Sequence, residues 1–316
     1  MSRVAAIDCG TNSIRLLVAD VPDAGAHTDL LRRMEIVRLG EGVDATGRLA
    51  PQAIERTRVV LAEYAAQARE LGAGRVRMVA TSATRDAANR ADFEDMVRTT
   101  LGQAPDVIPG REEAELSFLG ATASLDAAAR AHGNAAPRPP FLVVDIGGGS
   151  TEFVLGDGDG VRAARSVDIG CVRLTERHLR GDPPSAEEIR LAETDIRAAL
   201  AEVTAEVPVA EAATLVGLAG SVTTVAALAL ELPAYDADAI HGSRIAIAAV
   251  RAVTADLLAA TRERRAALPV MHPGRVDVIG AGALVLRVLM DEFGAGEVVV
   301  SEHDILDGIA LRLARG

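Results

Sequence analysis

The sequence predicts an α/β protein of two domains, each containing a mixed sheet. First, the chain has 316 residues, whereas a single hydrophobic core stops growing near about 250 residues. Second, apolar residues make up 49% and charged residues 25%, as in globular domains with a sizeable core. Third, one pattern opens both halves: an apolar run, then Asp-x-Gly-x-x-Ser, then a second apolar-rich run.

The two copies of this pattern are AAIDCGTNSIRLLV at residues 5–18 and LVVDIGGGSTEFVL at residues 142–155. A repeat of this kind indicates two halves that begin with the same supersecondary unit. Equivalent positions are 137 residues apart, and they are Asp8 and Asp145, Gly10 and Gly147, and Ser13 and Ser150.

Each half is expected to open with three strands, because two apolar runs flank a turn rich in Gly, Ser and Thr. In the first half these strands cover residues 4–9, 14–21 and about 29–39. A helix is predicted at 51–71, where apolar residues recur at helical spacing after Pro51. A strand at 75–80, a helix at 91–101, a strand at 106–108 and a helix from residue 111 complete this half.

The second half repeats the opening with strands at 141–146, 152–156 and about 161–169. Helices are then expected at 185–203, from 221, at 244–261, at 275–293 and from 303, with strands at 215–218 and 297–300. Strands followed by alternating helices and strands imply a mixed sheet in each half.

The Pro/Gly-rich segment 131–140 has the composition of a linker and predicts the domain boundary. We therefore expect domains at residues 1–135 and 136–302, with the helix at 303–316 returning to the first domain. Two domains of this kind usually hold their ligand in the cleft between them.

Charge and composition exclude several classes of protein. The net charge of −12 disfavours nucleic-acid binding, and the absence of lysine excludes a P-loop. The uncharged run 212–230 has glycines and hydroxyl residues at its centre, which predicts strand, turn and helix and no membrane span. The N-terminus lacks the pattern of a secretory signal, and two cysteines suit a reducing compartment. We expect a cytoplasmic protein, and a homodimer is left open.

The Asp-x-Gly-x-x-Ser turns suit phosphate binding. Glycines let the backbone approach a ligand closely, and successive N–H groups then form a nest for an anion. An Asp at the strand end would repel phosphate directly, so it is expected to act through Mg²⁺. One such turn is commonly only a turn, but two at matched positions predict a clamp for a chain of phosphates.

The doubled hairpin resembles the actin-like (ribonuclease H-like) ATPase fold. Within that superfamily the chain resembles the exopolyphosphatase and guanosine pentaphosphate phosphatase (Ppx/GppA) family, in its short two-domain form. The resemblance runs from residue 5 to about 310, and it is carried by IDCGTNSIRLLVAD, VATSATRDAAN, IPGREEAELSFLGA, VVDIGGGSTEFVLG and DIGCVRL.

The resemblance implies roles for individual residues. Glu113, the second Glu of the G-x-E-E-A run, is implied as the catalytic carboxylate that orients and deprotonates the attacking water. Asp145 and Glu152, with Asp8, are implied to hold Mg²⁺ or another divalent cation. Phosphate contacts are implied for the side chains of Asn12 and Arg85 and for the backbone of Thr11, Asn12, Ser13, Gly147, Gly148, Gly149 and Ser150.

The residues taken alone have simpler interpretations. Glu112, Glu113 and Glu115 could form the acidic first turn of a solvated helix, and Arg85 a surface ion pair. Arg111 and Arg173 are further candidates for a basic channel. No histidine spacing typical of a zinc site occurs among the six histidines.

Four functions are compatible with these features. The first is Mg²⁺-dependent removal of terminal phosphate from inorganic polyphosphate, and the second is hydrolysis of the 5′-terminal phosphate of guanosine pentaphosphate. Scarce aromatic residues favour polyphosphate, since a nucleobase prefers a stacking surface. The others are an actin-fold kinase and a non-catalytic polyphosphate-binding module.

Overall fold

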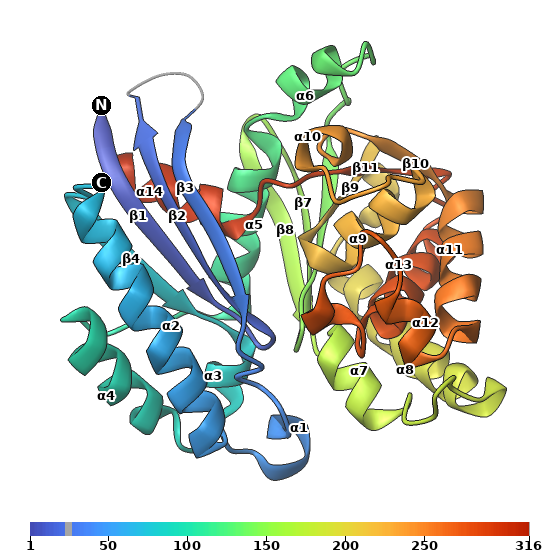
Figure 1. The fold of residues 1–316 in the computed structure, drawn as a ribbon. Helices are drawn as coiled ribbons and strands as arrows, with labels where there is room; N and C mark the ends of the chain where they lie inside the picture. Colours follow the sequence, from blue (N-terminus) through green and yellow to red (C-terminus); the bar gives the residue numbers. More distant parts are fainter. Residues whose placement is uncertain (23–26, 316) are drawn as a thin grey trace. The chain divides into compact units, whose positions relative to one another are not determined.

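The computed structural model describes residues 1–22 and 27–315 (Figure 1). The chain forms two compact units: Met1–Ala123 with Asp304–Gly316, and Ser124–His303. The division falls after Ala123, before the Pro/Gly-rich segment at which the sequence places it. Helix α6 (Leu125–Ala131) packs within the second unit, where a Cβ added to Gly242 would lie 2.7 Å from Cβ of Ala128.

The first unit contains a five-stranded mixed sheet in the order β3-β2-β1-β4-β5. Strands β1, β2 and β3 are antiparallel neighbours, whereas β4 and β5 continue the sheet in parallel from β1. The strands are β1 (Ser2–Cys9), β2 (Ser13–Val21), β3 (Thr28–Ile36), β4 (Arg75–Ala80) and β5 (Asp106–Val107).

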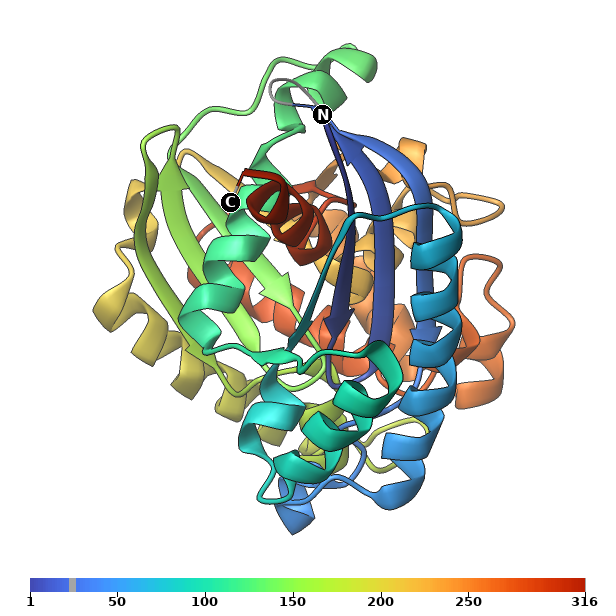
Figure 2. The same ribbon diagram turned by 90° about the vertical axis from the view of Figure 1, so that its left-hand side faces the viewer.

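Helices cover both faces of this sheet, as Figure 2 shows. Alternate residues of β1 point to opposite faces, so Ala5 and Ile7 join a core with helix α2, while Val4 and Ala6 pack against α14. The helices are α1 (Val43–Thr46), α2 (Pro51–Glu70), α3 (Ser82–Asp86), α4 (Arg90–Leu101), α5 (Gly110–Thr122) and α14 (Ile305–Arg315).

Helices α5 and α14 pack with their backbones nearly in contact. A Cβ added to Gly120 of α5 would lie 1.8 Å from the Asp304 carbonyl oxygen, and one added to Gly308 of α14 would lie 2.0 Å from that of Leu116. Glycine is required at both positions, because any larger residue would push the helices apart. This packing holds α5, which carries Glu113, against the C-terminal helix.

The second unit contains a six-stranded mixed sheet in the order β10-β11-β9-β6-β7-β8. It repeats the first arrangement: β6, β7 and β8 are antiparallel, and β9 and β11 extend the sheet in parallel from β6. The strands are β6 (Phe141–Ile146), β7 (Thr151–Asp157), β8 (Gly160–Val167), β9 (Thr214–Leu218), β10 (Arg244–Ala246) and β11 (Glu297–Val300).

The core of this unit lies between the sheet and several helices, of which α13 is almost entirely buried. Its helices, besides α6, are α7 (Cys171–Arg177), α8 (Ala186–Glu206), α9 (Ala219–Ala229), α10 (Ala237–Ile240), α11 (Ile247–Ala259), α12 (Arg262–Ala266) and α13 (Ile279–Glu292), with 3₁₀ turns at Val209–Glu211 and Pro273–Arg275. The prediction of an α/β protein with two mixed sheets is therefore confirmed.

Short elements account for the errors in the sequence prediction. The helix expected at 244–261 begins as strand β10, whose three residues pair with β11. The helix expected from 275 begins at Ile279, after a 3₁₀ turn. Helices of four to seven residues, such as α1, α3 and α7, were missed because they are too short to show a 3.6-residue period.

The uncharged run 212–230 contains β9 and the whole of α9, so it forms a strand and a helix as predicted. Among the residues that the structure describes, no helix has the length and apolar character needed to cross a bilayer.

Candidate functional site

The turn between β1 and β2 is held by backbone hydrogen bonds on its carbonyl side. Gly10 N–H donates to the Ser13 carbonyl at 3.0 Å and closes the turn. The Asn12 carbonyl accepts from the N–H groups of Val37 (3.1 Å) and Arg38 (2.9 Å), in the segment that follows β3. The Thr11 carbonyl likewise accepts from the N–H of residue 40, at 2.8 Å.

The turn between β6 and β7 is built in the same way. Gly147 N–H donates to the Ser150 carbonyl, again at 3.0 Å. The carbonyls of Gly147, Gly148 and Gly149 accept hydrogen bonds from backbone N–H groups of residues 170–173, which follow β8. A Cβ added to Gly170 would lie 2.2 Å from the Gly148 carbonyl oxygen, so only glycine allows this close approach.

These bonds leave the amide sides of both turns available. In the described part of the chain, no hydrogen bond is made by the N–H groups of Thr11, Asn12, Gly148 or Gly149. Backbone N–H groups that are fixed by their carbonyl partners and lack an acceptor form an anion-binding nest. Each unit therefore carries one turn suited to phosphate.

Asp145 and Glu152 are directly opposite each other on β6 and β7. Residues paired in this way point to the same face of a sheet, so the two carboxylates are neighbours. Both side chains are buried, and Glu152 accepts a hydrogen bond from the Ser166 hydroxyl at 2.8 Å. Adjacent buried carboxylates repel unless a cation or a proton balances them. This oxygen-donor pair fits a hard divalent cation such as Mg²⁺.

Asp8 occupies the equivalent position in the first unit, but its cross-strand partner is Arg15. Arg15 donates to Asp8 Oδ2 through Nε (3.0 Å) and Nη2 (2.6 Å), and it also forms an ion pair with Asp304. Burial raises the pKa of Asp8, and the nearby guanidinium opposes that increase. Asp8 Oδ1 is buried and has no hydrogen-bond partner among the described residues, so it could accept from a water bound to a cation.

Glu113 lies in the first turn of α5, and its side chain is buried. Its Oε2 atom accepts a hydrogen bond from Arg85 Nη1 at 3.1 Å. The same nitrogen donates to the Ile108 carbonyl at 3.0 Å, which fixes the guanidinium beside the start of the helix. The structure thus brings together the residues expected to provide a catalytic carboxylate and a phosphate-contacting arginine.

Other predicted residues of the first unit lie nearby or at the surface. Thr11 is connected to α3, the helix of Arg85, by a 2.9 Å hydrogen bond between its hydroxyl and that of Ser82. Arg111 is 81% exposed and forms an ion pair with Glu115 on the same helix, so the structure does not associate it with Glu113.

Arg173, in the second unit, lies against the turn between β6 and β7. Its Nε donates to the Gly149 carbonyl at 2.8 Å, and its side chain is largely buried. Arg173 therefore lies beside a candidate site residue, whereas Arg111 does not, although both are candidates from the sequence.

Sequence reasoning missed three residues. Arg15 could have been found, because it stands seven positions after Asp8 just as Glu152 stands seven after Asp145. Asp304 had no local signal, since it is 289 residues from Arg15. Arg275 packs so closely on the α9 turn that a Cβ added to Gly220 would lie 2.3 Å from its Cζ.

A second group of metal-ligand types occurs in the first unit, where His27, Asp29 and Asp307 place ligand atoms within 4.8 Å of one another. Its charges are already balanced: Arg32 forms ion pairs with both carboxylates, and the hydrogen bonds that His27 donates to Asp29 and Asp307 raise the pKa of His27 to about 9. A protonated histidine cannot ligate a metal. We therefore treat this group as an ion-pair cluster.

Comparison with known proteins identifies relatives that cover the whole chain. Residues 17–315 match the Ppx/GppA phosphatase family. Exopolyphosphatase 2 of Mycobacterium tuberculosis is 53% identical, over 99% of both chains. The crystal structure of an exopolyphosphatase-like protein superposes with a TM-score of 0.92 at 41% identity, covering 99% of this chain and 98% of the other.

A more partial match is the guanosine-5′-triphosphate,3′-diphosphate pyrophosphatase of Photobacterium profundum. It is 36% identical over 58% of this chain and 35% of its own length. Given the family match and the full-length similarity to exopolyphosphatase 2, this chain belongs to the Ppx/GppA phosphatase family.

Proposed function

We propose that this protein is a Mg²⁺-dependent exopolyphosphatase, which hydrolyses the terminal phosphoanhydride bond of inorganic polyphosphate. The observation that carries the proposal is the partly buried ion pair between Glu113 and Arg85 at the start of α5. Full-length similarity to a relative named exopolyphosphatase 2 supports the choice of substrate. The two free, buried cysteines suit a reducing cytoplasmic compartment.

Glu113 would orient the attacking water and accept its proton as the oxygen bonds to the terminal phosphorus. The bond to the bridging oxygen then breaks, and the shortened polyphosphate leaves with the electron pair. Such transition states are loose, so positioning and charge neutralisation provide most of the rate. Arg85 lies beside Glu113 and would neutralise charge on the phosphoryl oxygens.

The two turns would bind the phosphate chain through their backbone N–H groups, together with Asn12. Asp145 and Glu152 would hold the divalent cation, with Asp8 contributing through water. When bound, the cation would neutralise the substrate's oxygens. The proposal requires the turn of each unit to reach the same substrate.

A second candidate is hydrolysis of guanosine pentaphosphate, which the partial similarity to the Photobacterium enzyme favours. The phosphate-binding features serve either substrate, because they contact phosphate and not the base. Only two Tyr, five Phe and no Trp occur in the chain, so aromatic surfaces for a guanine are scarce. We therefore rank polyphosphate first.

The test is phosphate release from short polyphosphate, long polyphosphate, guanosine pentaphosphate and ATP, each with Mg²⁺ and with a chelator. Glu113→Gln should lower kcat on polyphosphate by about 10²- to 10⁴-fold, because a general base is removed. Glu115→Gln is the matched control two residues away, and it should retain activity. Thermal melting verifies that both variants are folded.

Unchanged turnover by Glu113→Gln would remove Glu113 from its role. Turnover of guanosine pentaphosphate alone would favour the second candidate. Turnover of ATP alone would favour the actin-fold kinase. Binding of polyphosphate without any turnover would indicate a binding module.

A further inference from the structure

A cavity of about 460 Å³ lies in the second unit, far along the sheet from the Gly147–Ser150 turn. Leu142 and Leu215 line it, and they stand at the beginnings of the parallel strands β6 and β9. The turn begins at Gly147, five residues after Leu142, which at about 3.3 Å per residue is about 16 Å along the strand. The cavity is therefore separate from the Gly147–Ser150 turn of its own unit, and its volume is typical of sites for small molecules.

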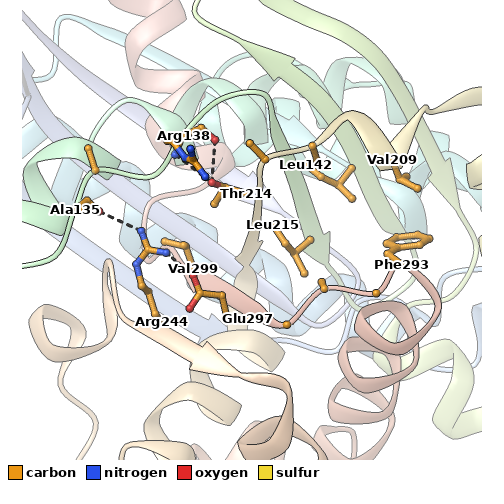
Figure 3. A pocket seen from close by; sticks show the side chains of 16 residues that line it. Ala135, Arg138, Leu142, Val209, Thr214, Leu215, Arg244, Phe293, Glu297 and Val299 are labelled. Atoms are coloured by element: carbon orange, nitrogen blue, oxygen red, sulfur yellow. Dashed lines mark hydrogen bonds and ion pairs between the residues drawn. The ribbon is translucent and has the colours of Figure 1, made fainter.

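The floor and one wall of this cavity are apolar, as Figure 3 shows. Leu142 and Leu215 form the floor, directly opposite each other on the neighbouring strands β6 and β9, and Phe293 stands beside them at the end of α13. The Phe293 ring is fixed by an edge-to-face contact with Phe153, with ring centroids 6.0 Å apart. This surface would gain free energy by contact with an apolar ligand.

The rim of the cavity carries two arginines in different situations. Arg244 forms an ion pair with Glu297 and donates to the Ala135 carbonyl at 3.1 Å, so its charge is neutralised. The backbone N–H and carbonyl of Arg138 both bond to the Thr214 hydroxyl, at 3.1 and 2.8 Å, which fixes this residue at the rim. Its guanidinium makes no hydrogen bond or ion pair with any residue that the structure describes.

We propose that this cavity binds a small organic monoanion, an aromatic or aliphatic carboxylate whose apolar body lies on Leu142, Leu215 and Phe293 and whose anionic group pairs with Arg138. One uncompensated positive charge beside an apolar floor matches one anionic group on an apolar body. Polyphosphate does not match, because it has no apolar part and would need several cations. The proposal does not depend on the proposed catalytic function.

The experiment measures binding of 4-phenylbutyrate and of its uncharged amide by ligand-observed NMR titration, because the chain lacks tryptophan as an internal reporter. The carboxylate should bind with a dissociation constant on the order of 1 mM, as expected for a ligand of this size. The amide should bind about 5-fold more weakly, since it lacks the charge-assisted hydrogen bond to Arg138.

Arg138→Gln should weaken carboxylate binding by about 5-fold and leave amide binding unchanged. This side chain is exposed, so the substitution leaves the core intact. Arg130→Gln, on α6, is the matched control, because Arg130 is also exposed and its side chain has no partner among the described residues. Gly296→Phe should abolish binding of both ligands, since a Cβ at this cavity-lining position meets open space.

The proposal would be overturned if the wild type bound the acid and the amide equally well. It would also be overturned if Arg138→Gln weakened binding of both ligands equally, or if a folded Gly296→Phe variant bound them as the wild type does. Competition by inorganic triphosphate would also overturn it, by showing that the acid occupies a phosphate site. Loss confined to the acid in Arg138→Gln would support it.

Discussion

The β1–β2 and β6–β7 turns share the same pattern of backbone hydrogen bonds but differ in the charges beside them. In both, a glycine N–H closes the turn onto a serine carbonyl, and the segment after the third strand bonds to the turn's carbonyls. The residue opposite the strand-end aspartate is Arg15 in the first unit and Glu152 in the second. Asp8 is thus balanced from within the protein, whereas Asp145 has a second carboxylate beside it.

This difference shows how two copies of the same turn can carry different charges and so bind different groups. The backbone bonds that orient the N–H groups are kept in both turns, because any phosphate-binding nest needs them. The position opposite the aspartate does not shape the turn, so it can change sign. We infer that the first turn binds phosphate without its own metal and that the second turn holds the cation.

The largest loss of stability is expected from Arg15→Met. The substitution leaves Asp8 and Asp304 buried without their shared cation, and removing one partner of a buried ion pair costs about 3–5 kcal/mol. Chemical denaturation measures this loss. Arg98→Met is the control, because the exposed pair of Arg98 with Asp95 should contribute less than about 1 kcal/mol. Equal losses in the two variants would contradict the role given to Arg15.

A smaller loss of stability is expected when a methyl group is added to the glycine that packs against each turn. Gly170→Ala places a Cβ 2.2 Å from the Gly148 carbonyl oxygen, whereas Gly40→Ala places one 2.2 Å from Cγ2 of Thr11. Each should lower stability by about 1–3 kcal/mol, since a packed group must move.

The two glycine variants differ in how they can be rescued. Adding Thr11→Ser to Gly40→Ala removes the obstructing methyl group and keeps the hydroxyl that bonds Ser82, so most stability should return. The obstacle at Gly170 is backbone, which no side-chain truncation removes. Thermal melting of the single and double variants tests this, and a failed rescue at Gly40 would show that the first turn is held differently.

Substitutions of the acidic residues beside the two turns should change the Mg²⁺ dependence of activity to different extents. Glu152→Gln removes one of two adjacent carboxylates, so the Mg²⁺ concentration for half-maximal activity should rise about 10-fold. Asp8→Asn should raise that concentration less than Glu152→Gln does, because Asp8 would contribute only through water and Arg15 already balances its charge. A larger shift in Asp8→Asn than in Glu152→Gln would reverse our assignment of the cation to the second turn.

The smallest effect concerns the ends of the β-hairpins. In the first unit, hydrogen bonds to Asp29 and Asp307 raise the pKa of His27 from 6.5 to about 9, so folding favours the protonated form. This stabilisation is fully present below pH 6.5 and is lost as the pH rises through about 9. The corresponding end in the second unit, between Asp157 and Gly160, has an Arg162–Asp157 pair instead.

Melting temperatures of the wild type and His27→Gln should therefore differ most near pH 6 and converge above about pH 9. Arg162→Gln serves as the control, and its difference from wild type should stay constant over this range, because arginine does not titrate there. If the melting temperatures of the wild type and His27→Gln differed by a constant amount from pH 6 to 10, the pairing of protonated His27 with Asp29 and Asp307 would be excluded.

Much of the candidate site was predictable because its residues lie close to a recognisable turn. Gly147 and Ser150 close their turn as the repeat with Gly10 and Ser13 implied. Glu113 was placed correctly at the start of a helix. Its pairing with Arg85 could not be derived from spacing alone, because 28 residues separate them and the register of β4 against β1 decides where Arg85 emerges.

The sequence alone determined the two α/β sheets, the twin turns and the candidate residues in them, because apolar periodicity and glycine-rich turns are local signals. Only the tertiary structure decided which charges meet: Arg15 with Asp304, Glu113 with Arg85, and Arg244 with Glu297 at the rim of the cavity in the second unit. The physical reason is that such pairs form between segments far apart in the chain, where packing sets the distance and sequence carries no record of it.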